Sequence, residues 1–275
     1  MEQEIVWPPL RDVLARYDLK ARKALGQHFL CDMNLTRRIV ACAGDLSGCT
    51  VFEVGPGPGG LTRALLESKA ERVVVIEKDE RFFPALQEVE AMVPGRMQLI
   101  GGDALTLDLE ALAPPPRVVV ANLPYNVGTE LLVGWLKKID AFRSLTLMFQ
   151  AEVVDRLVAA PSSKAYGRLS VLTQFCAVPQ RVMELPASVF VPPPKVASAV
   201  VRLVPRPDRP PDIPIRVLET VTAHAFGQRR KMLRSSLKPL GGEALLAQAG
   251  IDPTARAETL SLAQFEALAR LVARQ

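Results

Sequence analysis

Cysteine and histidine are scarce in this chain, whose 275 residues include four Cys and two His. Cys31, Cys42, Cys49 and Cys176 show no Cys-x-x-Cys spacing, which argues against a zinc site and against a disulfide framework. We therefore expect free thiols in a reducing cytosol, and no bound metal ion.

Long apolar runs are also missing. No run approaches the roughly 20 residues that span a bilayer, and the first ten residues contain acids and prolines where a secretory signal needs an apolar core. We expect a cytoplasmic protein that does not contact a membrane.

A strong charge is missing as well: the net charge is +5 and the pI about 9.2, a modest excess that favours a polyanionic partner.

Apolar strands and helical stretches alternate from Thr50 onward. This alternation is typical of an α/β fold, in which a mainly parallel sheet is covered by helices on both faces. Two late strands, Val178–Leu185 and Val196–Val204, follow where the alternation stops. The earlier strands are expected at Val51–Val54, Arg72–Ile76, Met97–Ile100, Val118–Ala121 and Leu145–Phe149, with helices after Gly60, Asp79, Gly128 and Ala151.

A proline-rich segment at 205–214 is the clearest linker, because prolines at this density exclude helix and weaken strand. We therefore predict two domains. Residues 1–204 form the larger one and begin with a helical and basic segment at 1–48, in which Asp32 caps a helix. Residues 205–275 form a small all-helical domain. Its helices are expected at Ile215–Phe226, Arg229–Leu237, Glu243–Ala249 and Leu262–Ala273.

A glycine-rich turn follows the first strand and opens a helix. Gly55, Gly57 and Gly60 satisfy G-x-G-x-x-G, a pattern that alone leaves open a dinucleotide site or a tight turn without a ligand. Acidic residues near strand ends discriminate between these interpretations. Glu53, Glu77 and Asp103 belong at the carboxyl edge of the sheet, where several carboxylates would repel a pyrophosphate. They favour a cationic adenosine ligand, which describes S-adenosylmethionine.

Asparagine is equally rare, and two of the three asparagines lie in Asn122-Leu123-Pro124-Tyr125-Asn126, directly after a buried strand. An amide, a proline and an aromatic ring at that place suit the binding of a flat nucleobase by its amino group. We expect the Asn122 side-chain oxygen and the Leu123 carbonyl to accept hydrogen bonds from an adenine N6 amine. Tyr125 and Phe190 would stack on the base once it has left its helix.

Together these motifs resemble the bacterial rRNA adenine N6,N6-dimethyltransferases, most closely those of the small subunit. The similarity covers about residues 23–238 and also rests on Gly26–Leu30, Phe190–Ser198 and Phe226–Arg234. It implies a Rossmann-like class I methyltransferase fold with a mainly parallel seven-stranded sheet, and S-adenosylmethionine as the cofactor. The implied substrate is a pair of adjacent adenosines, dimethylated at N6, in the 3′-terminal hairpin of 16S rRNA within the assembling small subunit (pre-30S).

The resemblance also implies roles for individual residues. His28 stands where many members of the family carry Asn, and both side chains can donate a hydrogen bond. Contacts with the cofactor are implied for His28, Leu30, Gly55, Glu77, Asp103 and Asn122. A frame around the target adenine is implied for Asn122, Leu123, Tyr125 and Phe190.

Basic residues of the C-terminal part suggest a surface for RNA. Arg230, Arg234 and Lys238 would share one helix face. This spacing alone favours a solvated charged face, and it is the nucleobase motif at Asn122–Asn126 that favours RNA. We expect a monomer. RNA contacts are expected at Lys23, Lys195, Arg229, Arg230, Lys231 and Arg234.

Three other functions stay open. A large-subunit adenine methyltransferase of the antibiotic-resistance type shares the core motifs, but residues 228–234 and the Pro-Pro-Pro-Lys loop favour the small-subunit enzyme. A ribosome-assembly factor that binds RNA without catalysis would not need an intact Asn122–Tyr125 motif. A dinucleotide-dependent oxidoreductase would leave the same motif unexplained.

Overall fold

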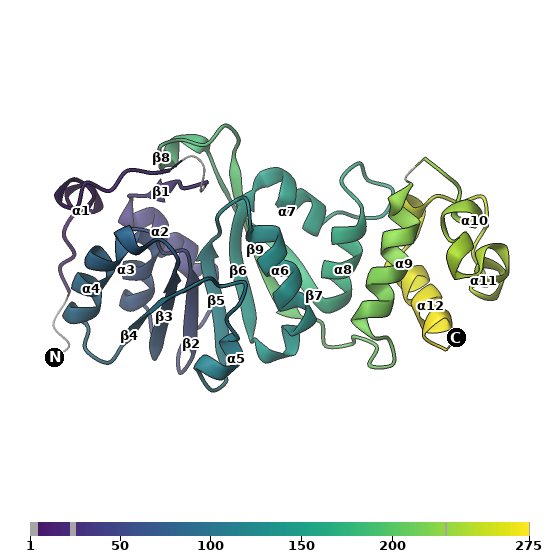
Figure 1. Ribbon diagram of the computed structural model, residues 1–275, viewed down its shortest axis with the longest axis horizontal. Coiled ribbons are helices and arrows are strands. Elements are labelled where there is room, and N and C mark those ends of the chain that lie inside the picture. The colour runs from purple at the N-terminus through teal and green to yellow at the C-terminus, as the bar shows by residue number, and fades with distance from the viewer. Residues whose placement is uncertain (1–4, 23–25, 229, 275) are drawn as a thin grey trace. The chain divides into compact units, whose positions relative to one another are not determined.

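The computed structural model of the protein describes residues 5–22, 26–228 and 230–274. Within them the chain divides into two compact units (Figure 1). The first contains residues up to Ala151 together with Gln180–Val204, and the second contains Glu152–Pro179 together with Pro205–Gln275.

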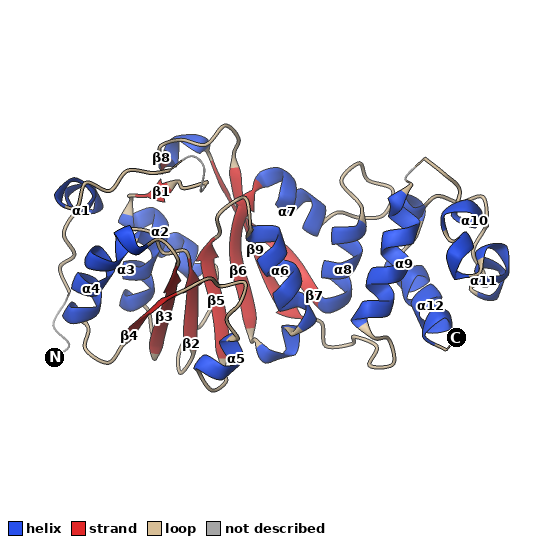
Figure 2. Ribbon diagram, viewed as in Figure 1, coloured by secondary structure: helices blue, strands red, loops and turns tan. Residues whose placement is uncertain are grey.

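The main sheet has seven strands in the order β4-β3-β2-β5-β6-β9-β7 (Figure 2). The pairs from β4 to β6 are parallel, whereas β9 is antiparallel to β6. This confirms the prediction of a mainly parallel, seven-stranded Rossmann-like sheet. The strands are β2 (Thr50–Val54), β3 (Arg72–Glu77), β4 (Met97–Gly101), β5 (Arg117–Asn122), β6 (Ser144–Gln150), β7 (Ala177–Leu185) and β9 (Ser198–Pro205).

Helices cover the sheet because its strands are apolar on both faces. All five residues of β2 are buried, as a strand covered on both sides requires. Alternate valines of β3 and β5 join one core cluster with α2, α3 and α4, and Figure 2 shows α6 in front of the sheet. The helices of this unit are α1 (Leu10–Arg16), α2 (Met33–Ala41), α3 (Gly60–Glu67), α4 (Phe83–Met92), α5 (Leu109–Leu112) and α6 (Gly128–Lys137), with short 3-10 turns η2 (Glu80–Phe82), η3 (Ile139–Ala141) and η4 (Ala187–Val189).

Two aspartates cap helical segments as predicted. The Asp32 carboxylate accepts hydrogen bonds from the backbone N–H groups of Asn34 and Leu35 at the start of α2. The Asp79 carboxylate accepts from the Arg81 N–H at the start of η2, which leads into α4. These contacts satisfy N–H groups that the first turn of a helix leaves without a partner.

A second, two-stranded sheet was not expected from the sequence. It pairs β1 (Phe29–Leu30) antiparallel with β8 (Phe190–Val191), so that Leu30 lies opposite Phe190. This pairing places the Gly26–Leu30 motif beside the Phe190–Ser198 motif, although about 160 residues separate them.

The second unit is helical in its described residues. The predicted two-domain division at 204/205 differs from this grouping, because residues Glu152–Pro179 pack with the C-terminal helices. The assignment of a function to each domain stays a prediction. The helices are α7 (Ala151–Leu157), α8 (Arg168–Cys176), α9 (Ile215–Gly227), α10 (Leu233–Ser236), α11 (Gly242–Gln248) and α12 (Leu262–Ala273), with 3-10 turns η5 (Lys238–Leu240) and η6 (Ala257–Thr259).

The prediction of a helix over Arg229–Leu237 was wrong in its extent. Helix α10 begins at Leu233, and the backbone N–H groups of Leu233 and Arg234 donate to the carbonyls of Ala255 and Pro253. Those tertiary bonds take the place of helical bonds to the preceding turn, so the residues before Leu233 do not continue the helix. Arg230, Arg234 and Lys238 therefore do not share one helix face.

Candidate functional site

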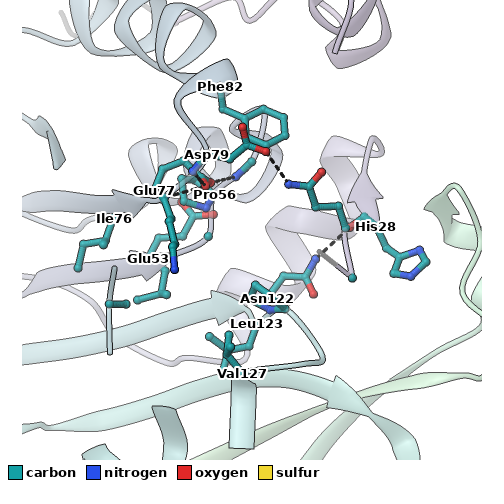
Figure 3. A pocket seen from close by; sticks show the side chains of 18 of the residues that line it. His28, Glu53, Pro56, Ile76, Glu77, Asp79, Phe82, Asn122, Leu123 and Val127 are labelled. Carbon is teal, nitrogen blue, oxygen red and sulfur yellow. Dashed lines mark hydrogen bonds between the residues drawn. The ribbon is translucent and has the colours of Figure 1, made fainter. Parts of the chain in front are cut away.

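A cavity of about 590 Å³ opens at the carboxyl ends of β2, β3 and β5, within the first unit (Figure 3). Its volume lies in the range of roughly 300–1,000 Å³ that is usual for small-molecule sites. The carboxyl edge is where open parallel sheets bind their ligands. The lining includes most of the site residues expected from the sequence: His28, Leu30, Gly55, Glu77, Asp103, Asn122, Leu123 and Tyr125.

The glycine turn brings three segments together. Gly55 has φ +69°, a left-handed conformation that side chains strongly disfavour, and it turns the chain sharply after β2. A side chain on Gly60 would collide with the Leu30 carbonyl oxygen, so only glycine lets β1 approach the first turn of α3. Glycine thus serves both the turn and the contact between the N-terminal motif and the loop.

Glu77 is buried at the end of β3 and is held by backbone donors. Its Oε2 accepts from the Gly57 N–H at 3.0 Å, and its Oε1 accepts from Lys78 and Asp79 at 2.9 and 2.7 Å. Burial raises the pKa of this carboxyl above its ordinary value, while the three N–H donors act in the opposite direction. The bonds fix the carboxyl at the cavity wall (Figure 3).

Glu53 differs from the other acids of the cavity. It is 1% exposed, and the Thr62 hydroxyl donates to it at 2.6 Å. Burial raises the pKa of Glu53 to about 8, and the nearby Glu77 acts in the same direction. At neutral pH it is mainly a neutral acid, so it adds little to the negative charge that the sequence pattern suggested.

Asp103 lies opposite a lysine. The Lys78 ammonium donates to its Oδ2 at 2.7 Å, and the Leu105 N–H donates to its Oδ1 at 3.0 Å. These bonds, led by that of Lys78, hold the pKa of Asp103 below its usual value. Asp103 therefore stays ionised at neutral pH, with both oxygens oriented.

Acidic side chains outnumber basic ones around the cavity. Apart from the mainly neutral Glu53, the lining residues include four acids, Glu77, Asp79, Glu80 and Asp103, and three bases, Arg22, Lys78 and Arg81. Two of those basic groups are already paired, Lys78 with Asp103 and Arg81 with Asp79. This balance suits a cationic ligand and disfavours a pyrophosphate.

Asn122 ends β5 and reaches across to the N-terminal motif. Its Nδ2 donates to the His28 carbonyl at 3.3 Å, which orients the amide and leaves Oδ1 as an acceptor at the cavity (Figure 3). The next turn is closed by the Pro124 carbonyl, which accepts from the N–H groups of Val127 and Gly128 at the start of α6. The amide thus lies at the cavity, and the turn after it is closed by Pro124.

Tyr125 and Phe190 are in different environments. The Tyr125 hydroxyl shares a hydrogen bond of 2.7 Å with the buried Ser198 hydroxyl, and burial raises the pKa of Tyr125. Phe190 is only 2% exposed, belongs to the main core cluster and does not line the cavity. Stacking of a base on Phe190 stays a prediction that requires the groups covering it to move.

The expected RNA contacts are only partly described. Lys23 and Arg229 lie outside the described residues. Lys195 is exposed in the loop between β8 and β9 of the first unit. Arg230, Lys231 and Arg234 are exposed in the second unit, where Arg234 lies 3.7 Å from Glu243.

Sequence reasoning missed a polar network at the cavity mouth. The Gln27 amide donates to Asp79 at 3.0 Å, and Arg81 bonds to both Asp79 and the Gln27 oxygen. Arg81 also donates to the Lys20 carbonyl. Arg81 and Asp79 are two positions apart, but no local pattern could have indicated the contacts of Gln27 and Lys20, because these join residues more than 50 positions apart. Gln27 within the Gly26–Leu30 motif was the one available signal.

No helix among residues 5–22, 26–228 and 230–274 is long and apolar enough to cross a bilayer. No group of three or more His, Cys, Asp or Glu side chains in that part of the chain could hold a metal ion.

Comparison with known proteins identifies close relatives. The profile of a family described as "Ribosomal RNA adenine dimethylase" matches residues 18–274. A "Ribosomal RNA small subunit methyltransferase A" from Paracoccus denitrificans is 58% identical over 270 residues, covering 96% of this chain and 95% of that protein. The protein of that name from Dinoroseobacter shibae is 57% identical over 271 residues, 97% of each chain.

Solved structures give the same fold. A dimethyladenosine transferase from Plasmodium falciparum superposes with a TM-score of 0.73 at 23% identity, covering 88% of this chain and 96% of that one. The 23S rRNA methyltransferase ErmE superposes with a TM-score of 0.68 at 26% identity, covering 90% of this chain and all of that one.

Proposed function

The chain belongs to the ribosomal RNA adenine dimethylase family, and from this we propose that it transfers methyl groups from S-adenosylmethionine to N6 of two adjacent adenosines in the 3′-terminal hairpin of 16S rRNA. The observation that carries the proposal is one cavity that joins two sets of residues. Glu77 and Asp103 offer acceptors to an adenosine ligand, and Asn122 and Tyr125 lie at the same cavity beside them.

The residues present fit S-adenosylmethionine. Glu77 offers carboxyl oxygens where a ribose would lie, and Asp103 is ionised and can accept from an adenine amino group. Two of the basic side chains that line the cavity are paired with carboxylates, which leaves the site suited to a cation. When bound, the sulfonium of this cofactor supplies an activated methyl group.

The chain's own contribution is mainly positioning. An adenine N6 lone pair is delocalised into the ring, so the nitrogen attacks well only when its N–H groups are held out of the ring plane. The Asn122 Oδ1 and the Leu123 carbonyl are the acceptors we assign to those two N–H groups. Neither is a strong base, and none is needed before attack, because the proton becomes acidic once the nitrogen is alkylated. Correct positioning can lower a barrier by about 7–11 kcal/mol.

A base in a stacked hairpin cannot enter the cavity, so the adenine has to be extruded at a cost of a few kcal/mol. Stacking on an aromatic side chain returns about 1–3 kcal/mol per base. Tyr125 lines the cavity directly after the Asn122-Leu123-Pro124 segment, and its hydroxyl is held by Ser198. We assign to Tyr125 the role of stacking on the adenine, and we assign Phe190 as the second aromatic residue that contacts the base.

The large-subunit alternative is less well supported. The small-subunit relatives share more than half of their residues with this chain, whereas ErmE, a 23S rRNA methyltransferase, shares 26%. We therefore favour 16S rRNA within the pre-30S particle as the partner. Lys195, Arg230, Lys231 and Arg234 are the described residues that we assign to RNA contacts. A monomeric state and a cytoplasmic location stay predictions.

The test uses the purified chain, labelled S-adenosylmethionine, and small and large ribosomal subunits from cells that lack this modification. We expect label in the small-subunit RNA alone, and nucleoside analysis should identify N6,N6-dimethyladenosine at two adjacent positions. Label in the large-subunit RNA would favour the resistance-type alternative. No label, with normal binding to particles, would favour a non-catalytic assembly factor.

A further inference from the structure

The His28 side chain lies close to both of the aromatic residues that we assign to the target base. Its ring centroid is 5.6 Å from that of Tyr125, with an angle of 33° between the planes. It is 6.5 Å from that of Phe190, in an edge-to-face arrangement at 77°. In Figure 3 the imidazole points away from Glu77, on the opposite side of Asn122. The ring is thus directed to the base side of the site and away from the cofactor side.

One hydrogen bond holds the imidazole there. The Nδ1 of His28 is 2.7 Å from the Pro192 carbonyl oxygen, and because a carbonyl only accepts, Nδ1 carries the proton. The pairing of β1 with β8 holds the backbone of both segments together. The position of the ring is therefore defined from two sides, by the backbone pairing and by its own polar contact.

Phe190 is covered in this arrangement. With 2% of its surface exposed, its ring offers no face on which a purine could stack. A flat heteroaromatic ring already lies beside it and beside Tyr125, in the role that an adenine would fill. A base can contact both aromatic rings only after the imidazole has left.

We propose that His28 is a gate for the target base: its ring occupies the adenine subsite in the RNA-free protein and must swing out before an extruded adenine can be held. This rests on the proposed function. The polar edge of the imidazole makes departure possible, since it can exchange Pro192 for water or RNA. While the imidazole occupies the subsite, the protein cannot hold the base. The apparent Kd for RNA is therefore the Kd of the open form divided by the fraction of molecules that are open.

The test compares three variants at this position. His28→Ala and His28→Asn remove the ring, and Asn keeps a hydrogen-bond donor. His28→Phe keeps a ring of similar size but loses the polar edge. Methyl transfer to undermethylated small subunits is measured at saturating S-adenosylmethionine. The cofactor Kd and the Tm of each variant are measured separately. His224→Ala, which removes the other histidine, from α9, is the matched control.

The gate predicts a characteristic order of rates. His28→Ala and His28→Asn should raise kcat/KM for small subunits about fivefold, mainly through a lower KM, and His28→Phe should lower it. A hydrogen bond that merely positions the loop predicts instead that Ala and Phe both fall below the wild type. That result, or unchanged values in Ala and Asn, overturns the gate. If His28→Ala does not fold, Asn against Phe gives the same comparison.

The two failures are distinguishable. If the wild-type protein transfers no methyl group to small subunits, the proposed function is wrong. If the wild type is active and the ring-free variants are no better than it, only the gate is wrong. His224→Ala is expected to match the wild type in kcat/KM, because His224 lies in the second unit and does not line the cavity.

Discussion

Replacement of Asn122 by alanine probes the catalytic assignment most sharply. The Asn122 amide has two roles: Nδ2 donates to the His28 carbonyl, and Oδ1 is the acceptor assigned to the adenine N6 amine. The loss of one preorganised group aimed at a transition state typically lowers kcat about 10²–10³-fold. The loss of a single ordinary hydrogen bond costs about 1 kcal/mol, or about fivefold in an equilibrium.

These magnitudes predict a separation between binding and turnover. In Asn122→Ala, kcat should fall about 10²–10³-fold, whereas the Kd for S-adenosylmethionine should rise by no more than about fivefold, through the lost His28 contact. Single-turnover methyl transfer to small subunits gives the rate, and calorimetric titration gives the Kd. Asn126→Ala is the matched control, since Asn126 is exposed in the same motif and should change either value by about twofold at most.

Two outcomes would refute the reasoning. A near-normal kcat in Asn122→Ala would show that the amide is not an acceptor for the reacting nitrogen. If the Kd for the cofactor rose by as large a factor as kcat fell, Asn122 would act by binding the cofactor in the ground state and would have no specific role in the transition state.

Three further predictions concern stability, positioning and RNA binding. The pKa of Glu53 in the folded protein is raised from 4.5 to about 8, so folding favours the protonated acid, and stability is lost as pH rises from about 4.5 to 8. Glu53→Gln should therefore flatten the fall in Tm between about pH 5 and 8, and equal slopes in the two proteins would contradict this. Ser198→Ala should lower kcat about fivefold, because the Tyr125 hydroxyl loses its hydrogen bond, and the cofactor Kd should not change. Ser198→Thr keeps a hydroxyl and should recover the rate. If it does not, the loss comes from altered packing and not from the hydrogen bond. Arg230→Glu with Arg234→Glu should weaken binding to small subunits and flatten its salt dependence, whereas unchanged binding would indicate a merely solvated surface.

The sequence was most informative where a pattern is local and repeated. The buried strands β3 and β5 contain continuous apolar runs, which is why their positions were predicted to within a residue or two. The glycine turn was predicted because Gly55 adopts a conformation that few other residues accept. Asn122 directly follows the predicted strand Val118–Ala121 and is the last residue of β5, so its place at the carboxyl edge of the sheet could be inferred from chain order alone.

The features that sequence reasoning missed depend on contacts between distant segments. The two-residue strands β1 and β8 are too short to show any periodicity and exist only because they pair with each other. Helix α10 is short because the Pro253–Ala255 turn takes the N–H groups of its first residues. The burial of Phe190 likewise follows from packing against the core, which its neighbours in sequence do not reveal.

The central claim is that a methyl donor and an extruded adenine meet at the carboxyl edge of the sheet, aligned by Asn122. It is tested most directly by an experimental structure of the protein with S-adenosylhomocysteine and the undermethylated small subunit. We expect the ribose at Glu77 and the target N6 within hydrogen-bonding distance of the Asn122 Oδ1. A target adenine that remains stacked in its hairpin, or a cofactor bound away from Glu77, would contradict the account.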